Sequence, residues 1–276
     1  MLTASLVAYH HTLQELQPVL DSMASEIHST LYIVDNGQDP QLQQDLYVCG
    51  DKRLEYIPAH NNGFGAGHNI AIRKAMKQNC DFHVILNPDI YFPAGTLKKI
   101  VDFMTEHPEI GLVMPKTVTQ TGELHYDCKL LPTPWDLIAK RFLPLFLKQK
   151  RMHRFMMKDF DYNKILDVPY LCGCFMVFRR EALEKAGLFD ECFFMYPEDI
   201  DITRRIYSAG FRTVYYPQAE VVHAHTQASY KNFKMLRIHI VNMIRYFNKW
   251  GWFWDPERKR INREILKRNK DKLCHY

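Results

Sequence analysis

The sequence of 276 residues predicts an α/β fold with a mostly parallel central sheet and helices on both faces. Apolar strand-like runs alternate with amphipathic runs, and short turns rich in Gly, Asn and Asp separate them. Hydrophobic residues make up 47% and charged residues 24%, which is typical of a globular chain and argues against disorder. The length suffices for one large domain, or for one domain with an extension.

The first part of the chain predicts a regular alternation of elements. Thr12 and Glu15 form a capping-box pattern that opens a helix toward Ile27, with Pro18 near its first turns. A glycine-rich loop is expected at 61–69, followed directly by a helix at 70–79. The other expected strands and helices are strands 2–9, 31–34, 54–57 and 82–86, a helix from about 94 to 106, and an apolar run at 110–118.

The later part is less regular. The apolar, basic and proline-broken stretch 130–158 predicts a surface segment or subdomain. A strand is expected at 170–180, a helix at 181–186 that ends at Gly187, and a helix after the acidic residues that ends at Ala209 and Gly210. Two strands are expected at 212–216 and 219–225, followed by two helical stretches. We therefore expect a catalytic-type domain over 1–230 and an extension over 231–276.

The N-terminus and the apolar runs predict a chain that stays in the cytoplasm. The first 17 residues have neither a basic region nor a small-residue cleavage site, so they predict a strand and not a signal peptide. No uncharged apolar run approaches the ~18 residues that a membrane span needs. Seven cysteines without CxxC pairs favour free thiols, and the single residue between Cys172 and Cys174 is a poor spacing for zinc.

The charge is concentrated in the tail. Between Lys231 and Tyr276 there are 13 basic and 4 acidic residues, whereas the preceding 230 residues carry 23 basic and 27 acidic ones. The same tail contains Trp250, Trp252 and Trp254. This combination predicts either an anionic membrane surface as partner or a solvated pair of basic helices that packs its aromatic residues on the core.

Ligands of parallel α/β sheets bind at the carboxyl ends of the strands, so the residues that follow each strand are the candidates. These are Tyr9, Asp35 with Asn36, residues 61–69, and Asn87 to Asp89. The motif Gly63-x-Gly65-x-Gly67 can admit a phosphate or a sugar, or can simply form a tight turn. Asp35 can accept hydrogen bonds from a base or ribose, or can act as a turn residue.

Two further patterns predict metal and acid–base chemistry. Asp89 follows four apolar residues and an Asn-Pro turn, which holds an oxygen ligand at the end of a strand. His223 and His225 lie on one face of a strand, where either could bind a metal. A metal at this edge would take its remaining ligands from substrate phosphates and water.

Three acids lie within four residues at Glu198, Asp199 and Asp201. Pro197 suits the start of a helix, acids are favoured in a first turn, and Asp201 can pair with Arg205 at i,i+4. On a helix Asp199 and Asp201 point about 200° apart, so they should have different roles. The preceding aromatic run could raise a carboxyl pKa, as suits a general base.

These pieces, in this order, resemble glycosyltransferase family 2. The blocks are "IVDNGQD", "NNGFGAGHNIAI", "ILNPDI", "CGCFMVFRREALEKAGLFDECFFMYPEDIDITRRIYSAG" and "VVHAHTQAS". The resemblance covers about residues 1 to 230 and is closest to bacterial rhamnosyltransferases of O-antigen and cell-wall assembly. It implies a GT-A-type, Rossmann-like fold and an inverting, nucleotide-sugar-dependent hexosyltransferase.

The resemblance also implies roles for single residues. Asp199 would be the catalytic base, and Gly173 and Glu198 would border the acceptor. Asp89 would bind Mg²⁺ or Mn²⁺ across the diphosphate, with His223 as a further ligand. Residues on the nucleotide-sugar side would be Tyr9, Asp35, Asn62, Gly63, Gly65, Asn69 and Asn87. Asn87 departs from the family's Asp-x-Asp motif and leaves a single carboxylate for the metal.

The implied reaction moves L-rhamnose from dTDP-L-rhamnose to a lipid-linked saccharide on a polyprenyl diphosphate. The basic aromatic tail would then hold the enzyme on the cytoplasmic face of the inner membrane, and a homodimer is compatible with this arrangement. Three alternatives stay open. A UDP-hexose or UDP-N-acetylhexosamine could be the donor, or the chain could be an inactive nucleotide-sugar binder. The tail also allows a nucleic-acid binder, which we do not expect, because that function leaves the acidic and histidine motifs unexplained.

Overall fold

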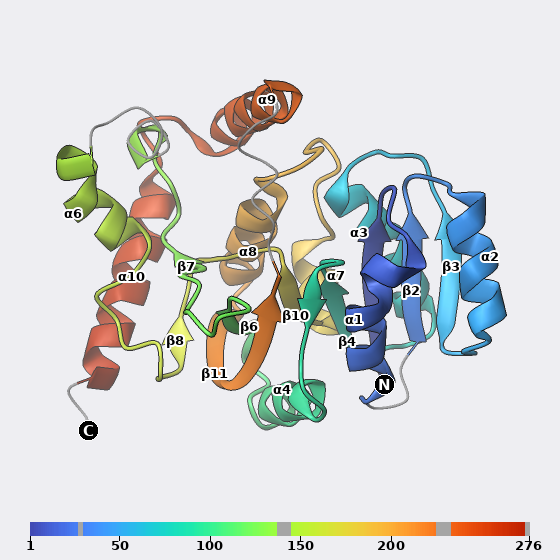
Figure 1. Ribbon diagram of the computed structural model, residues 1–276. Helices are drawn as coiled ribbons and strands as arrows, with labels where there is room; N and C mark the ends of the chain where they lie inside the picture. The colour runs from blue at the N-terminus through green and yellow to red at the C-terminus, as the bar shows by residue number, and fades with distance from the viewer. Residues whose placement is uncertain (27–29, 137–144, 225–232, 274–276) are drawn as a thin grey trace.

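The computed structural model describes residues 1–26, 30–136, 145–224 and 233–273, and it shows helices packed around one large sheet (Figure 1). The described strands are β1 (Leu2–Ala8), β2 (Thr30–Asp35), β3 (Leu54–Pro58), β4 (Phe82–Leu86), β5 (Ile90–Tyr91), β6 (Ile110–Val118), β7 (Cys128–Lys129), β8 (Leu166–Asp167), β9 (Tyr170–Leu171), β10 (Phe175–Arg179) and β11 (Arg212–His223). The described helices are α1 (Leu13–Ala24), α2 (Pro40–Cys49), α3 (Phe64–Lys77), α4 (Thr96–Glu106), α6 (Leu145–Phe155), α7 (Arg180–Ala186), α8 (Glu198–Ser208), α9 (Phe233–Trp250) and α10 (Pro256–Leu273).

The sheet has the strand order β3-β2-β1-β4-β10-β6-β11-β5, with β8 paired to β11. Strands β3, β2, β1 and β4 are mutually parallel, and β11 is parallel to β6. Strand β10 is antiparallel to both of its neighbours, β4 and β6, so β4 and β6 run in the same direction. The predicted mostly parallel sheet is confirmed, with β10 and the short strands β5 and β8 running against the common direction.

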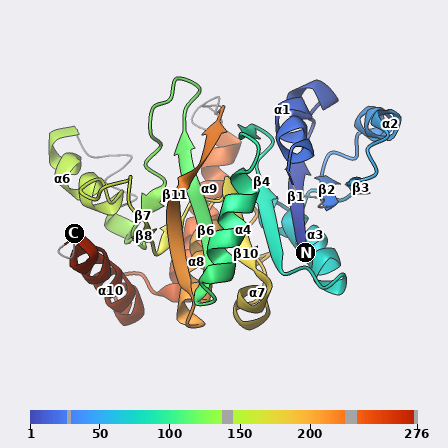
Figure 2. The ribbon, with the colours of Figure 1, turned by 90° about the horizontal axis from the view of Figure 1, so that it is seen from below.

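Alternate residues of the central strands enter two separate cores. Val84, Val113 and Val177 pack in one apolar cluster with α1, α2 and α4, whereas Ile85, Leu112 and Phe178 pack in another with α3, α7 and α8. Figure 2 shows α1 on one side of the sheet and α3 and α7 on the other. Because neighbouring side chains of a strand point to opposite faces, a strand covered on both sides is apolar throughout. Helices therefore cover both faces, as the sequence predicts.

Most of the expected elements are present. The capping box of Thr12 and Glu15 opens α1, which contains Pro18 and ends at Ala24, whereas Ile27 lies outside the described residues. Helix α2 was not expected, although Asp39 caps its N-terminus, Pro40 follows, and Gly50 ends it with φ +67°. This combination of N-cap, first-turn proline and left-handed glycine is a sufficient local signal.

The irregular middle of the chain contains short elements. Within the expected segment 130–158, the structure describes α6, and residues 137–144 lie outside the described part. The single strand expected at 170–180 is two strands, β9 and β10, which belong to different sheets. The break between them contains Gly173, and it separates the small β7–β9 pair from the central sheet.

The glycine-rich segment is not a loop throughout, contrary to the prediction. Helix α3 already begins at Phe64, so Gly65 and Gly67 lie in its first turns. A Cβ atom on Gly65 would lie 2.8 Å from Cβ of Phe189, and one on Gly67 would lie 2.9 Å from Cγ2 of Val7. Gly63 has φ +106°, and its Cβ would lie 2.2 Å from the Phe194 carbonyl oxygen. The glycines therefore permit close packing of α3.

The two strands expected at 212–216 and 219–225 are one strand, β11, and that prediction was wrong in this respect. The register of β11 against β6 shifts between Tyr216 and Glu220, which marks a bulge. The bulge places turn-like residues inside a continuous strand, which explains why the sequence suggested a break. The last expected residue, His225, lies outside the described residues.

The two C-terminal helices pack on the same core as the preceding domain. Tyr246 and Phe247 of α9 and Ile261 and Ile265 of α10 are buried in the cluster that also contains α8. The side chain of Arg204 in α8 is 1% exposed, and its guanidinium donates two hydrogen bonds to Asp255 at 2.7 and 2.8 Å. The same guanidinium lies 4.0 Å from the ring centroid of Trp250. Among the described residues, no helix is both long and apolar enough to cross a bilayer.

We expect Arg204→Leu to lower the free energy of unfolding by about 3–5 kcal/mol, because the substitution leaves the buried carboxylate of Asp255 without its main counter-charge. Arg260→Leu is the matched control, since Arg260 pairs with Glu264 on the exposed surface and should lose less than about 1 kcal/mol. Urea unfolding of both variants measures the difference. Equal losses in the two variants would contradict a structural role for the buried pair.

Candidate active site

The predicted metal ligands meet at the carboxyl edge of the sheet. The Nε2 atom of His223, at the end of β11, lies 3.2 Å from Oδ1 of Asp89, in the turn after β4. Short strand β5 brings the two together, because it follows Asp89 directly and pairs with the end of β11 through Ile90 and His223. The Asp89 side chain is 37% exposed and can reach a ligand, whereas that of His223 is 11% exposed.

The electrostatics of this pair fit a cation site. Burial alone would lower the pKa of His223, but the hydrogen bond and charge of Asp89 outweigh it and raise the pKa. One carboxylate and one imidazole are acceptable ligands for Mn²⁺ or Mg²⁺ when substrate phosphates and water supply the others. The donor set therefore fits the metal that the resemblance implies. His225, the other candidate, lies outside the described residues.

Asp199 lies at the start of α8, facing the turn that contains Gly173. Its Oδ2 accepts a hydrogen bond from the Gly173 N–H at 3.1 Å, and its Oδ1 accepts one from the Ile200 N–H at 2.8 Å. Burial raises the pKa of Asp199, and the charge of Lys129 and these backbone bonds offset only part of the effect. A Cβ on Gly173 would lie 3.2 Å from the Cβ of Asp199, so glycine permits this approach.

Glu198 is the second buried acid of the cluster, and it is 4% exposed. Burial and the neighbouring charge of Asp199 raise the pKa of Glu198 above its usual range. Within the described residues, its Oε2 atom has no hydrogen-bond partner. A buried carboxyl oxygen without a partner is costly, and such atoms are common where a substrate group binds.

Asp201 is different, since all of its bonds serve the fold. Its side chain is fully buried, and its oxygens accept hydrogen bonds from Arg205 Nε at 2.7 Å and Trp250 Nε1 at 2.8 Å. Lys249 adds an ion pair at 2.8 Å. The predicted pairing with Arg205 is confirmed. Asp199 and Asp201 also have different surroundings, while the different roles expected of them stay a prediction.

The residues that approach Asp199 from the β7–β9 pair were not predicted. Lys129 of β7 faces Tyr170 of β9 in the register of this small sheet, and its charge lowers the pKa of Asp199. Its Nζ atom lies 4.0 Å from Oδ1 of Asp127 and 5.0 Å from the ring centroid of Tyr170. The segment had no periodic signal that linked it to the acids, because its strands have two residues each.

Asp35 ends β2 and is fully buried. Its Oδ1 accepts a hydrogen bond from Gly37 N–H, and its Oδ2 accepts bonds from Asp39 N–H and from the Tyr56 hydroxyl. These bonds fix the turn after β2. Both the turn role and a contact to a nucleotide were open from the sequence, and the geometry gives direct support to the turn role.

The remaining residues of the nucleotide-sugar side fall into two groups. Tyr9 is 50% exposed and Asn62 is exposed, so both can contact a ligand. Asn69 is buried, and its amide bonds to the Phe189 backbone and to Glu191, which ties α3 to the segment before α8. Asn87 is half-buried, and its N–H donates to the Cys174 carbonyl, which joins the metal-side turn to the Gly173 turn.

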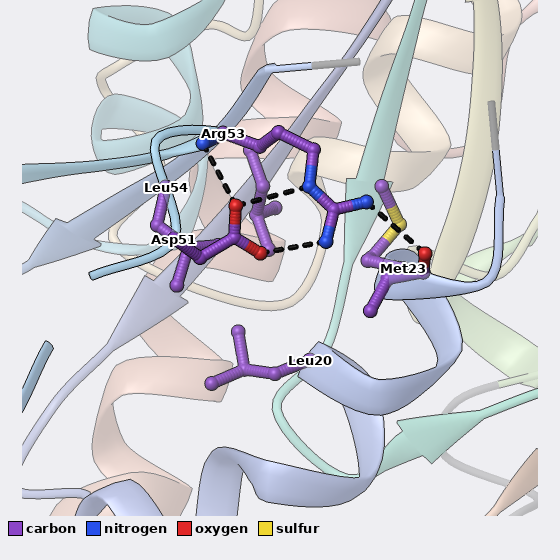
Figure 3. Close-up of a pocket in the computed structure, with 7 residues that line it drawn as sticks. Leu20, Met23, Asp51, Arg53 and Leu54 are labelled. Atoms are coloured by element: carbon purple, nitrogen blue, oxygen red, sulfur yellow. Dashed lines mark hydrogen bonds and ion pairs between the residues drawn. The ribbon is translucent and has the colours of Figure 1, made fainter. Parts of the chain in front are cut away.

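A small hollow at the opposite edge of the sheet has no such chemistry (Figure 3). Leu20, Met23 and Leu54 line it, and Arg53 bonds Asp51 and the Ala24 carbonyl beside it. It lies where β2 and β3 begin. Since ligands of parallel sheets bind at the carboxyl ends, we assign no function to this hollow.

The family comparison agrees with this geometry. The family model described as "Glycosyltransferase like family 2" matches residues 4–240. The chain belongs to this family. It is a glycosyltransferase, and the matched range includes most of β1, the Asp89 turn, the acids of α8 and His223.

Two curated relatives are rhamnosyltransferases. The N-acetylglucosaminyl-diphospho-decaprenol L-rhamnosyltransferase of Mycobacterium tuberculosis is 25% identical over 73% of this chain and 68% of its own length. Rhamnosyltransferase WbbL of Escherichia coli K12 is 26% identical over 97% of this chain and 96% of its own length. The resemblance to family 2, and within it to rhamnosyltransferases, is confirmed.

A solved structure supports the fold. The mannosyltransferase PcManGT of Pyrobaculum calidifontis, solved in complex with GDP-Man and Mn²⁺, superimposes with a TM-score of 0.59 at 19% identity. The match covers 88% of this chain and 64% of that protein, so the present chain spans less than two thirds of that neighbour's length. The expected GT-A-type fold is confirmed.

We expect Glu198→Gln to raise the free energy of unfolding at about pH 8. At a pH near the ordinary carboxyl pKa of about 4.3, the substitution should change this free energy little. The wild-type folded state keeps a proton that the unfolded chain releases, so its stability falls as the pH rises between the two pKa values, by about 1.4 kcal/mol per pH unit for one proton. The amide cannot titrate and escapes this loss. Urea unfolding across pH measures the difference.

Asp190→Asn is the control with the opposite sign. Burial would raise the pKa of Asp190, but bonds from Lys249 and Cys192 outweigh it and lower the pKa to about 2. The wild-type carboxylate therefore adds stability above its unfolded pKa and loses it as the pH falls toward 2. The asparagine variant should be the less stable one at neutral pH. A Glu198→Gln variant that follows the same trend would contradict the raised pKa of Glu198.

Proposed function

We propose that this enzyme is an inverting, metal-dependent transferase that moves L-rhamnose from dTDP-L-rhamnose to a lipid-linked saccharide in bacterial surface polysaccharide synthesis. The observation that carries the proposal is the environment of Asp199. Asp199 is a buried carboxyl with a raised pKa, held by backbone N–H groups, and it faces the Gly173 turn. Asp201, two residues on, is already used by three structural partners.

Asp199 would act as the general base. An acceptor hydroxyl is a weak nucleophile, and a carboxylate of raised proton affinity removes its proton as the oxygen attacks the anomeric carbon. The two backbone hydrogen bonds fix the orientation of the carboxylate before the acceptor arrives. One displacement inverts the anomeric centre, so the reaction needs no second catalytic carboxylate. Glu198 and Gly173 would border the acceptor.

Asp89 and His223 would hold Mg²⁺ or Mn²⁺. When bound, the ion supplies positive charge that offsets the charge developing on the nucleoside diphosphate leaving group. The two side chains lie 3.2 Å apart at the edge where the strands end, which supports a shared ligand. The turn of Asn87 is bonded to the Cys174 backbone, so the donor and acceptor sides are built on adjoining chain segments.

The donor pocket would be formed by the loops after β1 and β2 and by the segment that precedes α3. Tyr9 and Asn62 are exposed and would contact the nucleotide sugar directly. Gly63, Gly65 and Asn69 would act by fixing the position of α3 against the segment that leads to the acids. Asp35 would hold the turn beside the nucleobase of the donor through its three hydrogen bonds within the chain.

Two rhamnosyltransferases among the relatives favour L-rhamnose, and the name of the mycobacterial relative specifies a polyprenyl diphosphate saccharide as acceptor. The polyprenyl acceptor and the dTDP-linked donor are the specific claims of the proposal. A UDP-sugar donor would keep the same mechanism and change only the donor side.

The first test measures nucleoside diphosphate release from dTDP-, UDP- and GDP-sugars, with Mg²⁺ or EDTA and a membrane lipid extract as acceptor. We expect release from dTDP-L-rhamnose that requires the metal. Asp199→Asn should lose about 10²-fold or more, the usual contribution of a general base. Asp102→Asn, which removes an exposed acid of α4 that pairs with Lys98, is the control. Release from a UDP-sugar alone would show that the donor is a UDP-sugar and not dTDP-L-rhamnose. Release that survives in Asp199→Asn would exclude Asp199 as the general base.

We further propose that the enzyme binds the cytoplasmic face of an anionic membrane through its C-terminal helices. One face of α9 is buried, whereas Phe233, Ile240, Val241 and Ile244 of the same helix are 89%, 50%, 40% and 42% exposed. After α9, Trp252, Phe253 and Trp254 are also exposed. Exposed apolar and aromatic residues near basic ones are typical of interfacial helices. Trp250 does not share this role, since it bonds Asp201 and lies under Arg204.

The position of α9 connects this surface to the site. Asn242 donates to the Met195 carbonyl, Arg245 donates to the Cys192 carbonyl, and the ring of His239 stacks on Tyr196. Residues 192–196 lead directly into the first turn of α8, where the proposed base lies. A lipid-linked acceptor in the bilayer would therefore lie close to the base. A homodimer is compatible with this arrangement, and the oligomeric state stays open.

We expect the double variant Phe253→Ser/Trp254→Ser to lose most of its co-sedimentation with vesicles that contain anionic lipid, because these two exposed aromatic residues lie between the two basic C-terminal helices. Tyr47→Ser, which removes an exposed aromatic residue of α2, is the matched control. Raised salt should weaken wild-type binding, since screening reduces the contribution of the basic residues. Equal binding by both variants would exclude this loop as the membrane contact.

A further inference from the structure

A second group of metal-binding side chains lies beside the proposed acceptor site. Asp127, Cys172 and Cys174 place one carboxylate oxygen and two sulfur atoms within 4.8 Å of one another. The cysteines flank Gly173, and Asp127 immediately precedes β7. Pairing of β7 with β9, in which Cys128 faces Leu171, brings Asp127 next to Cys172. The group shares no residue with the proposed magnesium or manganese site of Asp89 and His223, although the ring centroid of His125 lies 5.9 Å from that of His223.

The potential ligands are not used by other strong interactions. The described cysteines, which include both of these, are free thiols. The Oδ2 atom of Asp127 is buried and has no hydrogen-bond partner among the described residues, and its Oδ1 lies 4.0 Å from Lys129 Nζ. The buried Nε2 atom of His125 also lacks a hydrogen-bond partner among the described residues. His125 lies two residues before Asp127, and the Asp127 N–H donates to its carbonyl.

We propose that Asp127, Cys172 and Cys174 bind a thiophilic divalent cation of the zinc class. Two thiolates and one carboxylate suit Zn²⁺. Mg²⁺ prefers six oxygen ligands and therefore competes poorly for such a site. Three protein ligands leave a fourth tetrahedral position for water or for His125. Ligand atoms within 4.8 Å need only small side-chain movements to reach Zn–S distances of about 2.3 Å.

The spacing of the cysteines argued against zinc only while they were considered alone. One intervening residue makes a tight two-sulfur site, and no other His, Cys, Asp or Glu lies within four residues of the pair. The third ligand comes from Asp127, 45 residues before Cys172, through the β7–β9 pairing. A metal bound there would be a property of the tertiary structure.

Occupancy would act on the proposed base. The N–H of Gly173, between the two cysteines, donates to Oδ2 of Asp199. Binding would release the two thiol protons and leave the net charge of the group unchanged, but a cation held by both flanking thiolates would fix this turn and place a bound water at the acceptor side. We therefore expect zinc to inhibit sugar transfer. This consequence rests on the proposed function, whereas metal binding itself does not.

Cobalt(II) is the probe that reports the ligands directly. The full chain, kept reduced with a phosphine, is titrated with Co²⁺ in excess Mg²⁺, and thiolate-to-cobalt charge-transfer absorption is recorded. We expect one bound Co²⁺ with thiolate absorption, which one equivalent of Zn²⁺ abolishes. Cys172→Ser/Cys174→Ser should lose the absorption, and Asp127→Asn should weaken binding at least about tenfold, as loss of even an outer-shell partner does.

Matched variants distinguish this site from the other thiols and from the Asp89 site. Cys192→Ser removes an exposed thiol elsewhere and should keep the absorption, and so should Asp89→Ala, which removes the proposed magnesium ligand. Urea unfolding verifies that each variant is folded. If the double cysteine variant does not fold, the Asp127→Asn variant tests the site instead, because Asp127 is only half-buried. Absence of thiolate absorption in the reduced wild type, or its survival in the double variant, would overturn the proposal.

Inhibition is measured separately. If the transferase assay succeeds, Zn²⁺ should inhibit the wild type and should inhibit Cys172→Ala at least about tenfold less potently. If the proposed transfer reaction fails, the cobalt titration still decides whether the site exists, so the two failures are distinguishable. Equal inhibition of the wild type and Cys172→Ala would exclude this site as the cause of inhibition.

Discussion

The fully buried carboxylate of Asp201 holds the functional half of the molecule together. A buried charge must be paired, and Asp201 is paired by Arg205 on its own helix and by Lys249 and Trp250 at the end of α9. These bonds join α8 to α9. Because Glu198 and Asp199 occupy the first turn of the same helix, an interaction that joins α9 to α8 also fixes the position of these two acids.

The three neighbouring acids consequently have three different environments. Asp201 is neutralised by cations, Asp199 is held mainly by backbone N–H groups near a single lysine, and Glu198 has an oxygen without a partner in the described chain. Burial raises the pKa of the last two. The antiparallel strand β10 makes this possible, because it starts at the edge where the parallel strands end and thereby brings Gly173 to Asp199.

Much of the fold and part of the site could be predicted from local patterns. Periodicity predicted β1, β2, β4 and α8. The strand ends and the acidic run singled out Asp89, His223 and Asp199, and the resemblance implied a role for each. Segments whose structure depends on distant contacts were harder to predict from the sequence. The glycines at the start of α3 suggest a loop until the packing of that helix against Phe189 and Val7 is known, and the bulge in β11 suggests two strands. Strands β7 and β9 are too short for any periodicity, so the lysine and the aspartate beside them were missed.

The sequence by itself determined most of the strands and helices in their order, the strand ends at which the candidate residues lie, and the family, because these follow from periodicity, turn residues and ordered motifs. Only the tertiary structure decided the surroundings of each acid. The properties of a carboxyl group depend on its burial and its partners, and the partners come from elsewhere in the chain. Gly173 is 26 residues from Asp199, and Trp250 is 49 residues from Asp201. Apart from the Asp201–Arg205 pair, which lies at i,i+4, no local pattern encodes which acid meets which partner.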